Sequence, residues 1–141
     1  MLARLYTRVL VPTTVIEEML QAGTPAPVRR WISQPPDWLD VRTDPPSDAT
    51  LGFLDPGESA AISLALSLRV ERILIDDWDG RAEAMRRNLR VTGTLGVLVL
   101  AHRRGLLDFE TALARLSQTN FYLSAELVRL VRLRLSGGAA E

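Results

Sequence analysis

Apolar positions along the chain follow two periods, which predict helices and strands in turn. Ala61, Leu64, Ala65 and Leu68 recur every three or four residues, so a helix is predicted over 55–69. Residues 73–75 are apolar without alternation, which is typical of a strand buried on both faces. By the same reasoning, further helices are predicted over 13–20, 28–32, 79–89, 94–105, 108–118 and 124–135, and further strands over 7–12, 39–42 and 90–93.

The order of these elements predicts the class of fold. Strands alternate with helices up to residue 93, and three helices follow, which indicates an α/β fold with a parallel sheet. Thr13 or Thr14 is expected to cap the helix over 13–20. Prolines are concentrated in a connector over 21–48, but neither side of it is long enough for a good core of its own. We expect a single domain over 1–135 and a flexible tail over 136–141.

Composition narrows the possible chemistry. Lysine is absent, so all 17 basic residues are arginines, and they balance 17 acidic residues. A net charge near zero gives no global field that attracts nucleic acid. With no cysteine and one histidine, the chain cannot use thiolate catalysis, a cysteine-based zinc site or a histidine-rich metal site. The N-terminus does not read as a signal peptide and no apolar run could span a membrane, so a cytoplasmic location is expected.

Carboxylates gather where the predicted strand over 72–75 ends. Asp76, Asp77 and Asp79 follow it directly. Glu18 comes one or two turns after the strand over 7–12, and Glu58 opens the preceding helix. Ligands of open α/β sheets bind beyond the carboxyl ends of the strands, so these acids are candidates for one site. Grouped carboxylates favour a hard cation such as Mg²⁺ or Mn²⁺, which supports phosphoryl transfer.

Each of these acids also has a structural interpretation. Asp76 and Asp77 can cap the helix that follows and complement its dipole. Glu58 lies in a helical first turn, where glutamate is common, and Glu18 fits a solvated helix face. Asp79 is expected on the surface unless the other acids bind a metal.

The basic side chains have two interpretations as well. Arg81, Arg86 and Arg87 form a solvated helix face, or they contact phosphates when the acidic edge binds RNA. His102 fits a helix C-terminus better than a catalytic role. Trp78 is notable because it lies inside the acidic cluster.

Several segments together resemble a known family. "VLVPTTVIEEM", "LDPGESAAISLAL", "ILIDDWDGR", "VTGTLGVLVLAHRRGLL" and "FYLSAELV" occur in the order seen in PIN-like proteins of the DUF3368 type. The resemblance runs from about residue 5 to residue 134. It implies a three-layer α/β/α fold with a parallel central sheet. It also implies a Mg²⁺- or Mn²⁺-dependent ribonuclease, often the toxin of a toxin–antitoxin pair, with RNA and an antitoxin protein as partners.

The resemblance assigns roles to residues of this chain. It implies Glu18, Glu58, Asp76 and Asp77 as catalytic residues. It implies Glu58, Asp76, Asp77 and Asp79 as metal ligands. Phosphate contacts then fall to Arg81, Arg86 and Arg87.

One part of the family pattern has no counterpart in this sequence. PIN domains begin with a central strand that ends in an aspartate, and this sequence matches the pattern only after that point. We therefore expect an N-terminally shortened sheet with unpaired edges. Rearrangement, exchange of elements between chains or dimerisation could close such an edge, and we predict a homo-oligomer. The alternative to a nuclease is a degenerate, non-catalytic module that binds RNA or a protein partner.

Overall fold

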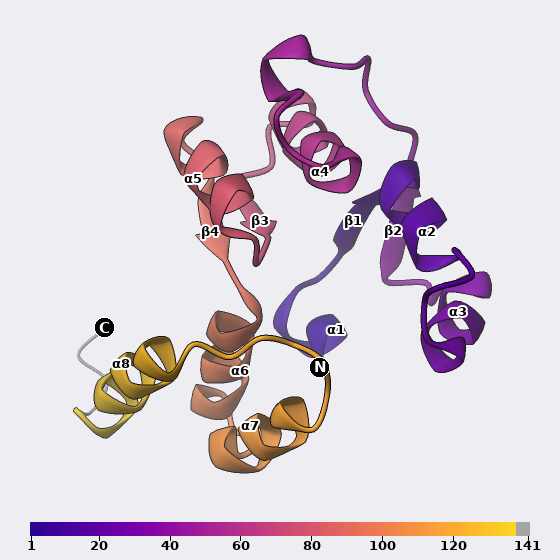
Figure 1. The fold of residues 1–141 in the computed structure, drawn as a ribbon. Helices are drawn as coiled ribbons and strands as arrows, with labels where there is room; N and C mark the ends of the chain where they lie inside the picture. Colours follow the sequence, from indigo (N-terminus) through magenta and orange to yellow (C-terminus); the bar gives the residue numbers. More distant parts are fainter. Residues whose placement is uncertain (138–141) are drawn as a thin grey trace. The chain divides into compact units, whose positions relative to one another are not determined.

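The computed structural model describes residues 1–137, which form two compact units (Figure 1). One unit comprises Leu2–Thr92, and the other comprises Met1 and the chain from Gly93 onward. The N-terminal unit contains α1 (Leu2–Leu5), β1 (Val9–Pro12), α2 (Thr13–Met19), α3 (Ala26–Ser33), β2 (Leu39–Arg42), the 3-10 helix η1 (Ala49–Leu51), α4 (Pro56–Ser67), β3 (Arg72–Leu74), α5 (Trp78–Arg86) and β4 (Arg90–Thr92). Whether the chain acts as the single domain expected over 1–135 stays a prediction.

The strands of the N-terminal unit pair in parallel, as expected for an α/β fold. Strand β1 pairs with β2, in a register that sets Val9 opposite Leu39, and β3 pairs with β4, with Arg72 opposite Arg90. Within the described residues these are two separate two-stranded sheets, and β1 is not hydrogen-bonded to β3. The parallel pairing is therefore confirmed, while the central sheet is split into two halves.

The burial of β3 differs from the prediction. Ile73 and Ile75 are buried, but Leu74 between them is 37% exposed. The prediction of a strand buried on both faces is therefore wrong. The reason is that β3 has one neighbouring strand and packs on α4, so one face of the strand is covered and the other is open. The covered face joins a core cluster of Leu51, Leu54, Ile62, Ala65, Ile73, Ile75, Ala84 and Leu89.

Helix α2 begins with a cap supplied from another segment. The Thr13 hydroxyl donates a hydrogen bond to Asp44 Oδ1 at 3.0 Å, and the Thr14 N–H donates to the same atom at 3.2 Å. The Thr14 hydroxyl donates to Asp44 Oδ2. Neither threonine caps the helix by its own side chain, because both side chains bind Asp44. Partial burial works against ionisation of Asp44, but the hydrogen bonds from Thr14 and Thr13 outweigh it and hold its pKa below the usual value.

The C-terminal unit is helical in its described part, as the apolar periodicity predicted. It contains α6 (Thr94–Arg103), α7 (Phe109–Ser117) and α8 (Ala125–Ser136). Gly105, with a φ of 72°, follows α6, and Asp108 and Ser124 accept hydrogen bonds as the N-caps of α7 and α8. Ser136 belongs to α8, and residues 138–141 of the expected tail lie outside the described residues. The core of this unit is formed by Leu95, Leu98, Val99, Phe109, Leu113 and Val128.

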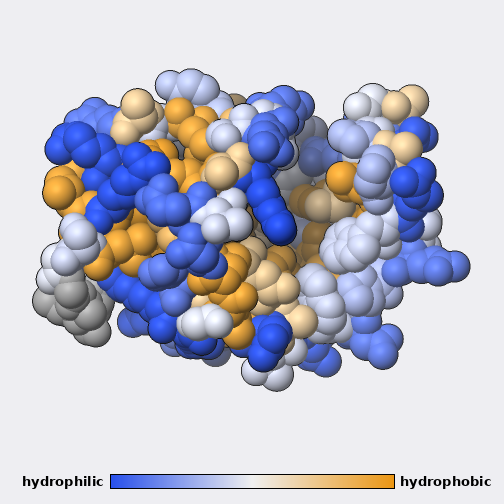
Figure 2. All heavy atoms as spheres, turned by 90° about the horizontal axis from the view of Figure 1, so that it is seen from below, coloured by the Kyte–Doolittle hydropathy of each residue, from blue (hydrophilic) through white to orange (hydrophobic). Residues whose placement is uncertain are grey.

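Hydrophobic side chains also reach the surface between charged ones (Figure 2). Among the residues that the structure describes, no helix has both the length and the hydrophobicity that crossing a bilayer requires.

The cap of α2 gives a first prediction. Asp44→Ala removes three hydrogen bonds at the start of this helix, so we expect the free energy of unfolding to fall by about 1–2 kcal/mol. Urea unfolding followed by circular dichroism measures this change. Asp37→Ala is the control, because Asp37 is exposed in the loop before β2. An unchanged urea midpoint for Asp44→Ala would show that Asp44 does not stabilise the helix.

Candidate acidic site

The first turn of α5 uses one of the predicted site residues as its cap. Asp77 Oδ2 accepts hydrogen bonds from the N–H groups of Asp79 and Gly80, at 3.0 and 3.3 Å. The structural interpretation of Asp77 therefore holds, and it does not exclude a second role for the carboxylate. Asp76 and Asp79 are exposed on either side of this cap. Trp78, the first residue of α5, is 81% exposed.

The first turn of α4 lies against the first turn of α5. Asp55 Oδ1 caps α4 by accepting the Glu58 N–H at 3.1 Å. The Glu58 side chain reaches α5, since a methyl group added at Gly80 would lie 3.2 Å from Glu58 Oε2. The same methyl would lie 2.6 Å from Ile75 Cδ1. The absence of a side chain at Gly80 therefore allows Glu58 to approach the helix that Asp77 caps.

Glu18 is placed beside α4 by a second glycine. A methyl group added at Gly57 would lie 2.5 Å from Glu18 Oε2 and 2.8 Å from Oε1. The Glu18 carboxylate thus occupies the space that a side chain at position 57 would need. Carboxylates from α2, α4 and α5 therefore come to the region around the N-terminus of α4, with Glu18 next to Gly57 and Glu58 next to Gly80.

The electrostatics of Glu58 reflect this arrangement. Partial burial is the largest cause that raises its pKa, and repulsion from Asp55, Asp77 and Asp79 adds to it. Together with a side-chain hydrogen bond to Asp55, these effects raise the pKa of Glu58 to about 7. Glu58 can therefore gain or lose a proton near neutral pH.

The arginines of α5 do not form the simple solvated face that was one interpretation. Glu83 is only 3% exposed and accepts hydrogen bonds from Arg86 Nη1 at 2.6 Å and Arg87 Nε at 2.8 Å. Arg87 also donates to the Thr50 hydroxyl at 2.8 Å, and Arg81 donates to the Ile75 carbonyl at 3.0 Å. The Arg86 side chain remains 76% exposed. The sequence interpretation missed Glu83, although its spacing of three and four residues from the two arginines was a usable signal.

His102 has the structural role that the sequence favoured. It lies in the last turn of α6, and its Nδ1 accepts the N–H of Phe109 at 3.0 Å. The imidazole therefore links the end of α6 to the start of α7.

A comparison of the sequence with protein-family models identifies the family of this chain. The model DUF3368, described as a PIN domain, matches residues 1–136. This chain belongs to the PIN-domain family DUF3368. The comparison with curated proteins gave no match, and neither did the comparison with solved structures. Membership gives this PIN domain a nuclease-like or nucleic-acid-related role.

PIN domains generally use divalent metal ions. The question is therefore whether the five candidate acids are placed so that they could coordinate such an ion. Carboxylate oxygens are the donors that Mg²⁺ and Mn²⁺ prefer. Among residues 1–137, however, no group of three or more acidic or histidine side chains is arranged to hold an ion. Glu18, Glu58, Asp76, Asp77 and Asp79 as placed therefore do not fit a resident metal.

The raised pKa of Glu58 gives a second prediction. The native chain keeps this proton up to about pH 7, whereas the unfolded chain releases it near the ordinary value of 4.5. Between these pH values the native state binds more protons, so its free energy of unfolding falls as the pH rises. Glu58→Gln removes this loss, and its Tm should exceed that of the wild type by about 3 °C or more at pH 8, but not at pH 4.

Thermal unfolding from pH 4 to pH 8 in EDTA tests this prediction. Glu17→Gln is the matched control, because Glu17 is an exposed glutamate of α2. A difference between Glu58→Gln and wild type that stays constant with pH would contradict the prediction.

Proposed function

We propose that this PIN domain is a ribonuclease that hydrolyses phosphodiester bonds at the acidic region around the N-termini of α4 and α5. The observation that carries the proposal is the concentration of carboxylates there, whose repulsion adds to the effect of partial burial in raising the pKa of Glu58 to about 7. Strongly perturbed carboxyl groups beside like charges are typical of functional sites. The family supports the choice of a nucleic acid as substrate.

The proposed roles follow from the position of each acid. Glu58 has a pKa suited to accepting a proton from the attacking water near neutral pH. Asp76 and Asp77 lie at the start of α5, and Glu18 borders α4 at Gly57. We assign these four residues to the catalytic site, and Asp79 to its acidic rim.

A cation belongs to the proposal in a restricted sense. Because the acids do not fit a resident ion, we propose that Mg²⁺ or Mn²⁺ is recruited together with the RNA, toward Glu58, Asp76, Asp77 and Asp79. Mg²⁺ is commonly bound by one or two carboxylates together with phosphate groups of the substrate. The family resemblance further supports a toxin role, with an antitoxin protein as partner, and the unpaired strand edges support a homo-oligomer.

Cleavage of a fluorescent single-stranded RNA in the presence of Mn²⁺ tests the enzyme. The double variant Asp76→Asn with Asp77→Asn should cleave at least ~10²-fold more slowly than wild type, and EDTA should stop cleavage by both. Asparagine is as good an N-cap as aspartate, so α5 should still begin normally. Glu126→Gln on α8 is the control, because Glu126 is exposed and lies in the C-terminal unit. Equal cleavage by the double variant and wild type would remove both aspartates from the site.

A non-catalytic RNA-binding module is the second candidate, favoured by the finding that no carboxylate cluster among residues 1–137 fits a metal. In that case the wild type binds RNA without cleaving it. Arg86→Ala should then weaken binding and reduce the slope of log K against log salt by about 1, because Arg86 is the most exposed of the three assigned arginines.

Fluorescence anisotropy at several salt concentrations measures this effect. Arg129→Ala provides the matched control, since Arg129 is an exposed arginine of α8. An unchanged salt slope for Arg86→Ala would show that Arg86 does not contact phosphate. Both arginines bind Glu83. Arg87→Ala is less informative, because the Arg87 side chain is only 26% exposed and also binds Thr50.

A further inference from the structure

Helix α5 presents an apolar face to solvent, with Trp78 at the end next to the acidic region. Trp78, Ala82 and Met85 are spaced so that they lie on one side of the helix. Trp78 is 81% exposed, Met85 is 56% exposed, and Ala82 is exposed as well. The other side of the helix faces the core, where Gly80 and Ala84 are buried. Packing of α5 in the N-terminal unit therefore does not account for a tryptophan at position 78.

The backbone of Trp78 lies between two of the acids assigned to the proposed site. Asp77 Oδ2 accepts the N–H groups of Asp79 and Gly80, so this cap fixes the backbone on both sides of Trp78. Consecutive Cα atoms are about 3.8 Å apart. A nucleotide whose phosphate meets Asp76 or Asp77 therefore has its base within reach of the Trp78 ring.

The charges around Trp78 limit what can cover its ring. Asp76, Asp77 and Asp79 are exposed beside it. An apolar protein surface docked on Trp78 would bury these carboxylates, and burying a carboxylate without a partner is costly. A nucleobase covers one face of the ring and leaves the acids in water. Because the acids also repel phosphates, RNA held here needs an attraction that does not depend on charge, and stacking supplies one.

The same helix offers a cation further along its axis. Arg86 follows Trp78 by about 12 Å of helix. Its side chain is 76% exposed, although Nη1 donates to Glu83. A guanidinium group has five N–H donors, so the exposed part of Arg86 can still contact a phosphate. An RNA strand that stacks on Trp78 and runs along α5 thus meets a positive charge.

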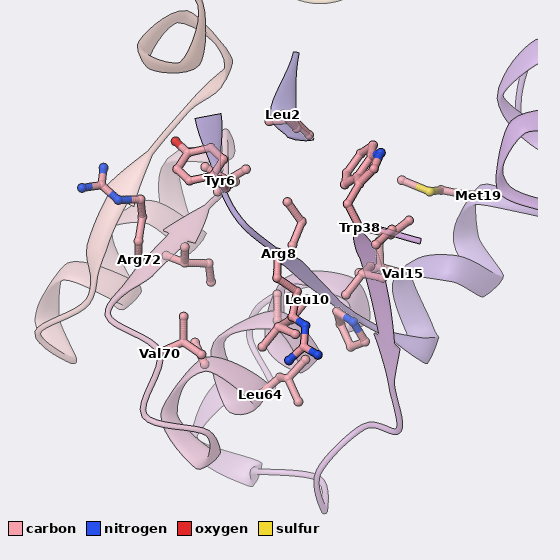
Figure 3. A pocket seen from close by; sticks show the side chains of 18 of the residues that line it. Leu2, Tyr6, Arg8, Leu10, Val15, Met19, Trp38, Leu64, Val70 and Arg72 are labelled. Carbon is pink, nitrogen blue, oxygen red and sulfur yellow. The ribbon is translucent and has the colours of Figure 1, made fainter. Parts of the chain in front are cut away.

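The apolar pocket of the same unit is a separate feature. Its volume is about 640 Å³, and its lining includes Leu10, Leu64 and Val70 (Figure 3). In the described chain no residue of α5 lines it. The face that carries Trp78 therefore does not belong to that pocket.

We propose that the Trp78 ring binds a nucleobase of the RNA by stacking, next to the phosphate that the acidic region receives. This inference rests on the proposed function. Stacking requires the base to be unpaired, because bases inside a duplex are already stacked on each other. It does not distinguish one base from another, since every base has a π face. The site therefore takes an unpaired nucleotide at this position without selecting its base.

Fluorescence anisotropy of labelled oligouridine in EDTA, where no cleavage is expected, tests binding to the full chain. Trp78→Leu should raise the Kd about tenfold, because an aliphatic side chain does not stack. Trp78→Tyr should stay within about threefold of wild type, because a phenol ring still stacks. Tyr122→Leu is the matched control, since Tyr122 is an aromatic residue of the C-terminal unit that is 85% exposed.

An abasic RNA of the same length isolates the stacking contact. It carries the same phosphates without bases, so wild type should bind it about tenfold more weakly than oligouridine. Trp78→Leu should bind the two RNAs equally. Oligouridine should also quench the tryptophan emission of wild type, whereas the emission of Trp78→Tyr, which keeps Trp31 and Trp38, should not change.

The cleavage assay separates this inference from the proposed function. In Mn²⁺, Trp78→Leu should raise KM about tenfold with little change in kcat, because stacking holds the RNA equally before and in the transition state. Cleavage with equal KM by Trp78→Leu and wild type would overturn stacking and leave the nuclease in place. Binding that depends on Trp78 without any cleavage would support stacking and contradict the nuclease.

A wild type that binds no RNA would overturn both the stacking and the proposed function. In that case, titration with the peptide acetyl-GRGRG-amide identifies the alternative occupant. Quenching of tryptophan emission that Trp78→Tyr loses would assign the ring to a cationic segment of a partner protein, through a cation–π contact.

Discussion

The packing of α4 is the interaction on which the N-terminal unit depends. This helix contacts β1 and α2, and it also contacts β3 and α5. Isolated two-stranded sheets are at best marginally stable in water. Because the two strand pairs share no ladder of hydrogen bonds in the described chain, burial against α4 is what holds both pairs in one unit. Ile62 and Ala65 of α4 are buried in one core cluster with Ile73 and Ile75.

The same helix explains where negative charge collects. The N-terminus of a helix carries a partial positive charge, and α4 and α5 begin close to each other. Gly57 and Gly80 leave room for the carboxylates of Glu18 and Glu58 beside these helix starts. Partial burial, together with repulsion from Asp55, Asp77 and Asp79, nevertheless raises the pKa of Glu58 to about 7. The fold thus maintains a concentration of charge that the packing of its core does not require.

The positions of the helices and strands could be predicted from the sequence more accurately than the contacts between them. Hydrophobic periodicity and local caps are local properties, so helices such as α4, with its Asp55 cap, could be located within a few residues. The cap of α2 could not be predicted, because Asp44 is 30 residues from Thr14. The exposure of Leu74 could not be predicted either, because it depends on whether another element covers that face of β3.

The candidate site shows the same division. The sequence predicted that Asp77 caps a helix, because it directly precedes one. It also predicted that acids from several segments group together, because ligands of parallel sheets bind beyond the carboxyl ends of the strands. The proximity of Glu18 to Gly57 and of Glu58 to Gly80 depends on how three helices pack, which one sequence does not specify. The buried Glu83 was missed because burial of a charged side chain depends on its ion pairs, here with Arg86 and Arg87.

Helix α4 also connects the acidic region to an apolar pocket of the N-terminal unit. Ala61, Leu64 and Ala65 of α4 line the pocket, and Glu58 lies one turn or two from them on the same helix. A methyl group added at Gly80 would lie 3.2 Å from Glu58 Oε2, so the Glu58 carboxylate lies close to α5. A small shift of α4 must therefore change the distance between this carboxylate and α5. Packed interiors transmit such shifts because they are dense. The pocket wall and the position of Glu58 beside α5 therefore depend on the same packing of α4.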